Sequence, residues 1–148
     1  MSSKTIETVR GIHHLDIPNF KAKWITSNAE IFKTAISGVQ THIFYDFADT
    51  IKMHNKSLAW LLHLSPRTVS NYHQNKQTLE PLQGEHLLKL IALYDKGVEL
   101  FGSIDEFNYW LNKPFWNAAE KPMDWLITPG GVDLVMQELD RLGYGYPV

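Results

Sequence analysis

The sequence predicts an all-α fold. Apolar residues recur at helical spacings of three and four positions in several separate segments. Helix start signals precede these segments: Ser27 and Ser103 each stand three residues before a glutamate, as in a capping box. Ser65 and Thr128 each stand directly before a proline, which is typical of a first helical turn. No strand pattern competes beyond the first residues, so we expect helices packed on helices.

The composition is typical of a soluble globular protein with one or two small domains. The chain has 148 residues, of which 44% are hydrophobic, and can bury a substantial core. No apolar run approaches the ~20 residues that cross a bilayer, and the first ten residues lack the apolar core of a signal peptide. We therefore expect a cytoplasmic location. The chain has no cysteine, which excludes disulfides, thiolate metal sites and cysteine nucleophiles.

The charges are distributed unevenly, although the formal net charge is only -2. From Lys52 to Lys76 the chain carries four basic residues and no acidic one. From residue 103 onward, seven acidic residues outnumber three basic ones. A locally cationic segment suits nucleic acid better than the net charge suggests, so the two halves are expected to face different partners.

The first predicted domain, residues 1–37, comprises an N-terminal arm and one helix. Residues 1–18 hold scattered apolar residues without helical spacing and end at Pro18, so we expect a mobile or loosely docked arm. Ser27 opens a helix that Gly38 ends. Four apolar residues are expected on one face of this helix: Ile31, Phe32, Ala35 and Ile36.

The second predicted domain, residues 38–102, places two long helices around a helix-turn-helix. Apolar residues spaced four apart from Val39 predict a helix that ends near Met53. After a polar loop, Pro81 opens a long helix that Gly102 ends. The apolar face of this helix is expected to form the centre of the core: Leu87, Ile91, Tyr94, Val98 and Phe101.

Residues 55–75 predict the helix-turn-helix itself. The first helix places three leucines on one face: Leu58, Leu61 and Leu62. Ser65 and Pro66 open the second helix, and Val69 packs inward. The other residues of the second helix are of the types that contact base edges and phosphates in the DNA major groove: Arg67, Thr68, Ser70, Asn71, His73 and Gln74.

A plain helical hairpin in a bundle is the alternative to a DNA-binding unit. Arg67 is the sole arginine on the second helix, and few phosphate contacts bind DNA weakly unless the protein dimerises and doubles them. We therefore expect a homodimer. A helix-turn-helix kept solely as a platform for dimerisation or for another protein remains an alternative.

The third predicted domain, residues 103–148, is a small helical unit. Ser103 opens a helix that Pro114 ends, an aromatic loop follows, and Thr128 with Pro129 opens the last helix, which ends at Gly143. One side of the last helix is apolar: Val132, Val135, Leu139 and Leu142. Trp110 and Trp125 lie on apolar helical faces and are expected in the core. Trp116 lies in the loop and suits an exposed anchor at an interface.

This domain combines several distinctive motifs: the Trp110-Leu111 helix, Asn112 and Pro114, the Lys121-Pro122 turn, Asp124–Thr128 leading into Pro129-Gly130, and Gly143-Tyr144-Gly145. In this order they resemble the toxin-binding domain of the Xre-type antitoxins in RES-Xre toxin-antitoxin modules, a group that includes the ParS-like antitoxins. The LSPRTVSNY segment fits the helix-turn-helix of the same family, so the resemblance runs from about Gly38 to the C-terminus.

The resemblance implies that the N-terminal helices bind the module's own promoter and that the C-terminal part binds a RES-type toxin, an enzyme that destroys NAD. It also implies that the extreme C-terminus lies over the toxin's active-site cleft. Aromatic rings interleaved with Gly and Pro suit an interface anchor. With Trp116, the expected toxin-binding residues are Tyr144, Gly145, Tyr146, Pro147 and Val148. The loop between Pro114 and Pro122 is more aromatic than in many relatives, so the choice of partner can differ.

Neither catalysis nor metal binding is expected. The chain has no Gly-rich phosphate loop and no nucleophile elbow, and no two of its seven histidines stand at the i, i+4 spacing of ligands on one helix face. We therefore expect no enzyme activity, no cofactor and no metal site.

Two other functions fit the same residues. One is a stand-alone helix-turn-helix transcription regulator whose C-terminal domain dimerises or senses a small ligand, and the other is a phage-like repressor without a toxin. Without the family resemblance, the last five residues would be an ordinary frayed terminus.

Overall fold

The computed structural model describes residues 6–9, 12–17, 20–21, 27–115 and 119–143. The described part is mostly helical, which confirms the predicted all-α class. The helices are α1 (Asn28–Ser37), α2 (Thr41–Thr50), α3 (Asn55–Leu61), α4 (Pro66–Gln74), α5 (Pro81–Phe101), α6 (Ile104–Leu111), α7 (Pro122–Trp125) and α8 (Pro129–Gly143). No helix within these described ranges is long and apolar enough to cross a membrane.

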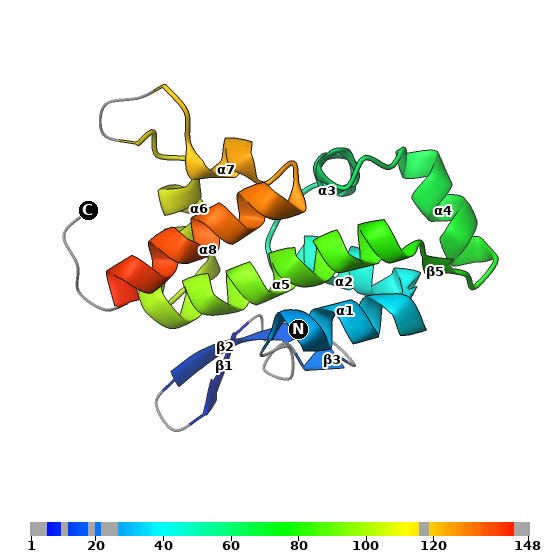
Figure 1. Ribbon diagram of the computed structural model, residues 1–148, viewed down its shortest axis with the longest axis horizontal. Helices are drawn as coiled ribbons and strands as arrows, with labels where there is room; N and C mark the ends of the chain where they lie inside the picture. The colour runs from blue at the N-terminus through cyan, green and yellow to red at the C-terminus, as the bar shows by residue number, and fades with distance from the viewer. Residues whose placement is uncertain (1–5, 10–11, 18–19, 22–26, 116–118, 144–148) are drawn as a thin grey trace.

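Helix α5 is the centre of the molecule, as Figure 1 shows: α8 lies along its C-terminal half and α1 packs near its N-terminal half. The predicted apolar face of α5 is confirmed for Leu87, Ile91, Tyr94 and Val98, which are buried, while Phe101 is partly buried against the core. Leu88, Leu90 and Leu93 are buried as well, so α5 meets neighbours on several sides. A helix that is apolar on most of its surface has to be enclosed by other elements.

The predicted helix starts are confirmed by their hydrogen bonds. Each capping hydroxyl accepts from the amide three residues further on, which satisfies a donor that has no partner within the helix. The Oγ atoms of Ser27, Ser65 and Ser103 accept at 3.2, 3.0 and 3.1 Å, and Thr128 Oγ1 accepts from Gly131 N at 3.0 Å. Gly102 ends α5 in the left-handed conformation, with φ 87°.

The N-terminal segment forms strands, so the expected loosely docked arm is wrong for its described residues. Strands β1 (Ile6–Val9), β2 (Ile12–Ile17) and β3 (Phe20–Lys21) form an antiparallel sheet in the order β1-β2-β3. Leu15 and Ile17 are buried in the core, and Leu15 N donates to Asp95 Oδ1 of α5 at 2.8 Å. The alternation of only two buried residues was too short to reveal the strand.

A second pair of short strands links the start of α2 to the end of α4. Val39–Gln40 (β4) pairs antiparallel with Thr78–Leu79 (β5). The helix expected from Val39 therefore begins at Thr41, and part of the expected polar loop is a strand. Thr41 Oγ1 donates to the carbonyl of Gln77 at 2.7 Å, which ties the two segments together next to the paired strands.

The apolar face expected on α1 is half wrong. Ile31 and Ala35 are buried, but Phe32 and Ile36 are 57% and 59% exposed. The packing of α1 against α5 is close, because a Cβ atom built on Gly84 of α5 would lie 3.9 Å from the Cα atom of Ala35. Only the row that contains Ile31 and Ala35 faces this narrow contact.

The core is continuous across the expected boundary at residue 102. The ring of Tyr94 contacts Phe47 of α2 and Phe107 of α6, with ring centroids 5.6 and 5.0 Å apart. Asn108 of α6 accepts from Tyr94 Oη at 2.8 Å and donates to the carbonyl of Ile51 at 3.0 Å. The N-terminal and C-terminal helices therefore share one core through α5.

Candidate functional site

Helices α3 and α4 and the turn between them form a compact unit at one end of the molecule (Figure 1). Leu58, Leu61 and Leu62 are buried as predicted, and His63 makes the turn with φ 60°. In α4, Val69 is buried and Tyr72 is partly buried against the core, whereas Arg67, Asn71, His73 and Gln74 are exposed.

The six predicted DNA-contact residues differ in how freely they can contact a ligand. Arg67 and Asn71 are exposed, and their side chains form no hydrogen bond or ion pair within the described part of the chain. Thr68 is half-buried and its hydroxyl lies 2.8 Å from that of Ser65. The other three contact neighbours or each other: Gln74 Nε2 donates to Ser70 Oγ at 3.5 Å, and the His73 ring lies 5.0 Å from that of Tyr45.

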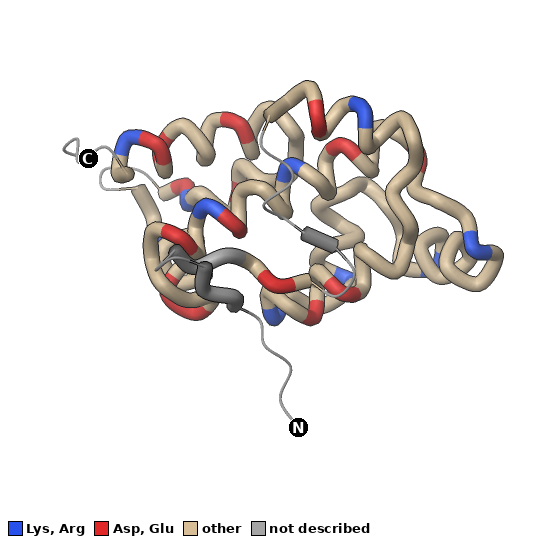
Figure 2. The backbone as a smooth tube through the Cα atoms, turned by 90° about the horizontal axis from the view of Figure 1, so that it is seen from below, with Lys and Arg blue, Asp and Glu red and all other residues tan. Residues whose placement is uncertain are grey.

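The charge of the α4 end is positive but smaller than the sequence indicated. Lys52 Nζ forms an ion pair with Asp105 Oδ1 of α6 at 2.9 Å, so this lysine is directed to the C-terminal helices. Helix α4 has one arginine and no acidic residue. Figure 2 shows Lys or Arg (blue) but no Asp or Glu (red) at the tip of the molecule that α4 forms. The acidic positions are spread over the remainder of the molecule.

Two histidines connect the α3–α4 unit and α5 to the link between α7 and α8. His63 Nε2 donates to the carbonyl of Ile127 at 2.7 Å, and His86 Nε2 donates to the carbonyl of Leu126 at 2.8 Å. His86 is buried, and burial lowers its pKa below the ordinary value of 6.5. The bond to Leu126 raises the pKa, while the nearby His63 and Lys89 lower it.

The lowered pKa of His86 predicts a loss of stability in mild acid. The unfolded state binds the proton more readily, so stability is complete above pH 6.5 and falls as the pH drops toward the folded-state pKa. Each unit of lowering corresponds to about 1.4 kcal/mol. Urea unfolding at pH 7.5 and at pH 5.5 measures this loss.

The matched control is His86→Gln, which keeps a side-chain donor for Leu126 but does not titrate. The variant is expected to lose less stability than the native chain between the two pH values. Equal losses in both proteins would contradict the assignment to His86.

Helices α6 and α8 pack against α5, and α7 packs against α6 and α8. Lys89 Nζ of α5 pairs with Asp133 Oδ2 of α8 at 2.8 Å, and Phe107, Val135 and Leu139 are buried beneath. Trp110 and Trp125 were expected in the core; both pack against it but are only partly buried. On the outside, Tyr109 is 69% exposed and Leu134 48% exposed.

The residues expected to bind a toxin are outside the described residues. These are Trp116 in the aromatic loop and the C-terminal group Tyr144, Gly145, Tyr146, Pro147 and Val148. The described ends of the loop are joined, since Phe115 N donates to the carbonyl of Glu120 at 2.9 Å and the Phe115 ring lies 4.9 Å from that of Trp125.

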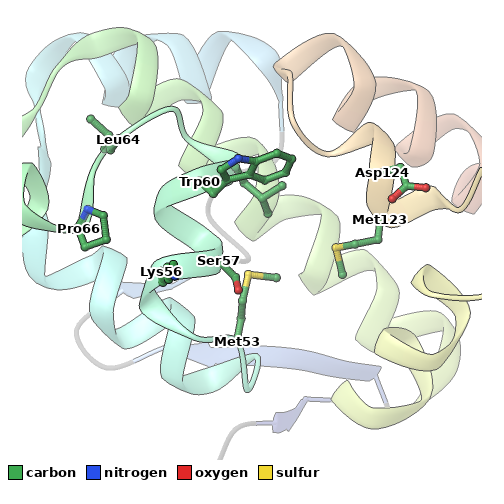
Figure 3. Close-up of a pocket in the computed structure, with 9 residues that line it drawn as sticks. Met53, Lys56, Ser57, Trp60, Leu64, Pro66, Met123 and Asp124 are labelled. Atoms are coloured by element: carbon green, nitrogen blue, oxygen red, sulfur yellow. The ribbon is translucent and has the colours of Figure 1, made fainter.

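Sequence reasoning missed an apolar pocket of about 600 Å³ between α3 and α7. Figure 3 shows Met53 and Met123 pointing toward one another across it, with the Trp60 ring beside them. Trp60 is 66% exposed, and Lys56 and Asp124 line the pocket with charged groups. One signal was available: helical spacing directs Leu58, Leu61 and Leu62 inward, which leaves Trp60 outward.

No group of three or more His, Asp or Glu residues within the described ranges is arranged to hold a metal ion. The described part of the chain is a helical body with the polar helix α4 at one end. The small unit of α6, α7 and α8 lies at the other end, packed on α5.

Residues 96–145 match the family described as the antitoxin Xre/MbcA/ParS C-terminal toxin-binding domain. The predicted resemblance to Xre/ParS-like antitoxins is therefore confirmed for this segment, which is similar to the toxin-binding domain of toxin-antitoxin systems. The match begins within α5, before the expected boundary at residue 103. No curated protein matches the chain.

Proposed function

We propose that this chain is a cytoplasmic antitoxin of a type II toxin-antitoxin system. Its C-terminal domain binds a RES-type NAD-degrading toxin and occludes the toxin's active site, and its α4 helix binds the operator of the shared operon. The family match over residues 96–145 carries the toxin-binding half of the proposal. The chain itself performs no chemistry.

The DNA-binding half rests on the outer face of α4. Arg67 and Asn71 are exposed and free of intramolecular side-chain partners within the described residues, so they can bind a base edge or a phosphate without first breaking a bond. Arginine and asparagine are the side chains that bind guanine and adenine by two hydrogen bonds. The single arginine on α4 supports a homodimer, because two copies double the contacts and read paired half-sites.

A crossed experiment tests both halves. The native chain is co-expressed with the product of the neighbouring reading frame, and two variants are compared with it: the double variant Arg67→Ala/Asn71→Ala and the deletion of residues 144–148. The double variant should weaken operator binding at least about 30-fold, since two base contacts are lost. It should still prevent the toxin from depleting NAD. The deletion should bind the operator normally and fail to inhibit the toxin, with Tyr146→Ala giving a partial loss.

Each variant is the control for the other. If the double variant loses neutralisation as completely as operator binding, the assignment of two separate surfaces is wrong. If the native chain forms no stoichiometric complex with the neighbouring product, the antitoxin proposal fails. A stand-alone helix-turn-helix regulator would then account for the operator binding.

A further inference from the structure

We propose that the toxin-contact surface extends beyond the C-terminal domain, and that the pocket between α3 and α7 receives an apolar side chain of the toxin. This inference rests on the proposed antitoxin function and names a second contact of the same partner. The inference depends on the pocket lined by Met53, Trp60 and Met123, which lies outside the C-terminal tail that was expected to bind the toxin.

The state of Trp60 supports a protein partner. An indole that is 66% exposed leaves a large apolar surface in water, and tryptophan is one of the three side chains enriched among the residues that dominate binding energy at interfaces. Met53 and Met123 are flexible and polarisable, so they can adjust to an incoming side chain. Met53, Trp60 and Met123 together form an apolar binding site whose two methionine side chains can change conformation to fit the partner.

The shape of the pocket favours a protein side chain over a small free ligand. Sites for small ligands enclose most of the ligand surface. Here one wall is the largely exposed Trp60, so an isolated ligand would remain in contact with water. A side chain presented by a folded partner needs no such enclosure, because the surrounding contacts of that partner exclude water around it.

The position of the pocket favours the toxin among macromolecular partners. Met123 and Asp124 belong to the segment that matches the toxin-binding domain, so the pocket is continuous with that domain. DNA is a poor occupant, since the lining is mainly apolar and Asp124 repels phosphate. The toxin surface is therefore expected to extend from the C-terminal domain onto α3.

The charges at the pocket narrow the chemistry of the occupant. Lys56 forms no ion pair within the described residues and can bind an acidic group on the partner. Asp124 Oδ2 already accepts from Lys121 N at 3.0 Å, so this carboxylate is partly engaged. The toxin segment that binds here is therefore expected to place an aromatic or branched aliphatic side chain in the pocket and an acidic residue next to Lys56.

The test uses the purified full chain and the purified product of the neighbouring reading frame. Trp60→Ala is expected to raise the Kd of the complex at least about 30-fold, because it removes the large exposed aromatic surface that forms one wall of the pocket. Ser57→Phe, which places a ring in the pocket while keeping Trp60, should weaken binding as well. The matched control is Phe32→Ala, an aromatic residue that is 57% exposed on α1, and it should leave the Kd unchanged. Thermal unfolding of each variant verifies that the fold is intact.

The outcomes separate this inference from the proposed function. If the native pair binds but Trp60→Ala and Ser57→Phe leave the Kd unchanged, the inference is overturned and the antitoxin function stands. If the native chain does not bind the neighbouring product, the proposed function fails and the inference with it. If sedimentation of the chain alone shows that Trp60→Ala abolishes self-association without altering toxin affinity, the occupant is a second copy. That result also overturns the inference.

Discussion

Phe107→Ala is expected to lower the free energy of unfolding by about 3–5 kcal/mol, the usual range for a fully buried phenylalanine. Phe107 has no exposed surface, and its ring centroid lies 5.0 Å from that of Tyr94, 5.8 Å from Phe101 and 6.0 Å from Trp110. These neighbouring rings are stiff, so they cannot fill the cavity that the substitution leaves. A small domain has only about 5–15 kcal/mol of total stability, so the loss would be severe.

The position of Phe107 against α5 strengthens this expectation. A Cβ atom built on Gly97 would lie 2.4 Å from the Phe107 ring, which shows that the ring occupies the space above the glycine backbone. Its removal would therefore weaken the packing of α6 on α5 within the segment that matches the toxin-binding family. Chemical denaturation of both proteins measures the effect.

The control is Tyr109→Ala on the same helix. Tyr109 is 69% exposed, and truncation of such a residue is expected to alter stability by less than about 0.5 kcal/mol. A loss below about 1 kcal/mol for Phe107→Ala would show that the aromatic cluster is not the main connection between α5 and α6.

Gly131→Ala should lower the free energy of unfolding by at least about 2 kcal/mol, at the upper part of the range for overpacking. A Cβ atom at this position would lie 1.8 Å from the carbonyl oxygen of Trp125, which is a backbone atom and cannot rotate away. The link between α7 and α8 would have to move. That link carries the Leu126 and Ile127 carbonyls to which two histidines donate, so these hydrogen bonds would weaken too.

The adjacent glycine is a matched control. Gly130 also lies in the first turn of α8, but a Cβ atom there meets nothing within 4 Å. Gly130→Ala is expected to be neutral or to stabilise the protein by up to about 1 kcal/mol, because alanine favours the helix. Urea unfolding of the two variants should thus give effects of opposite sign or of clearly different size. Similar losses in both variants would contradict the proposed clash.

The sequence predicted the helices well because their signals are local. A capping serine binds an amide three residues away, so its role does not depend on the remainder of the fold. The first strands were missed for the opposite reason. Leu15 is held by Asp95, eighty residues further along the chain, and no local pattern indicates that bond.

The candidate surfaces were predictable to a smaller extent. The exposure of Arg67 and Asn71 follows from the helical spacing around Val69. Lys52 was predicted to belong to the cationic segment, but it forms an ion pair with Asp105 of α6. The distribution of charge along a sequence does not reveal such a pair. The roles assigned to Trp116 and to residues 144–148 stay predictions.

The amino-acid sequence by itself determined the all-α class, the capped helix starts, the exposure of Arg67 and Asn71 on α4 and the resemblance to Xre/ParS-like antitoxins. Each depends on residues within a few positions of one another or on a contiguous motif. The tertiary structure decided that strand β2 docks on α5, that Phe32 and Ile36 stay exposed, and that a pocket forms beside Trp60. These features need residues that are distant in sequence to meet, and such contacts depend on how whole elements pack.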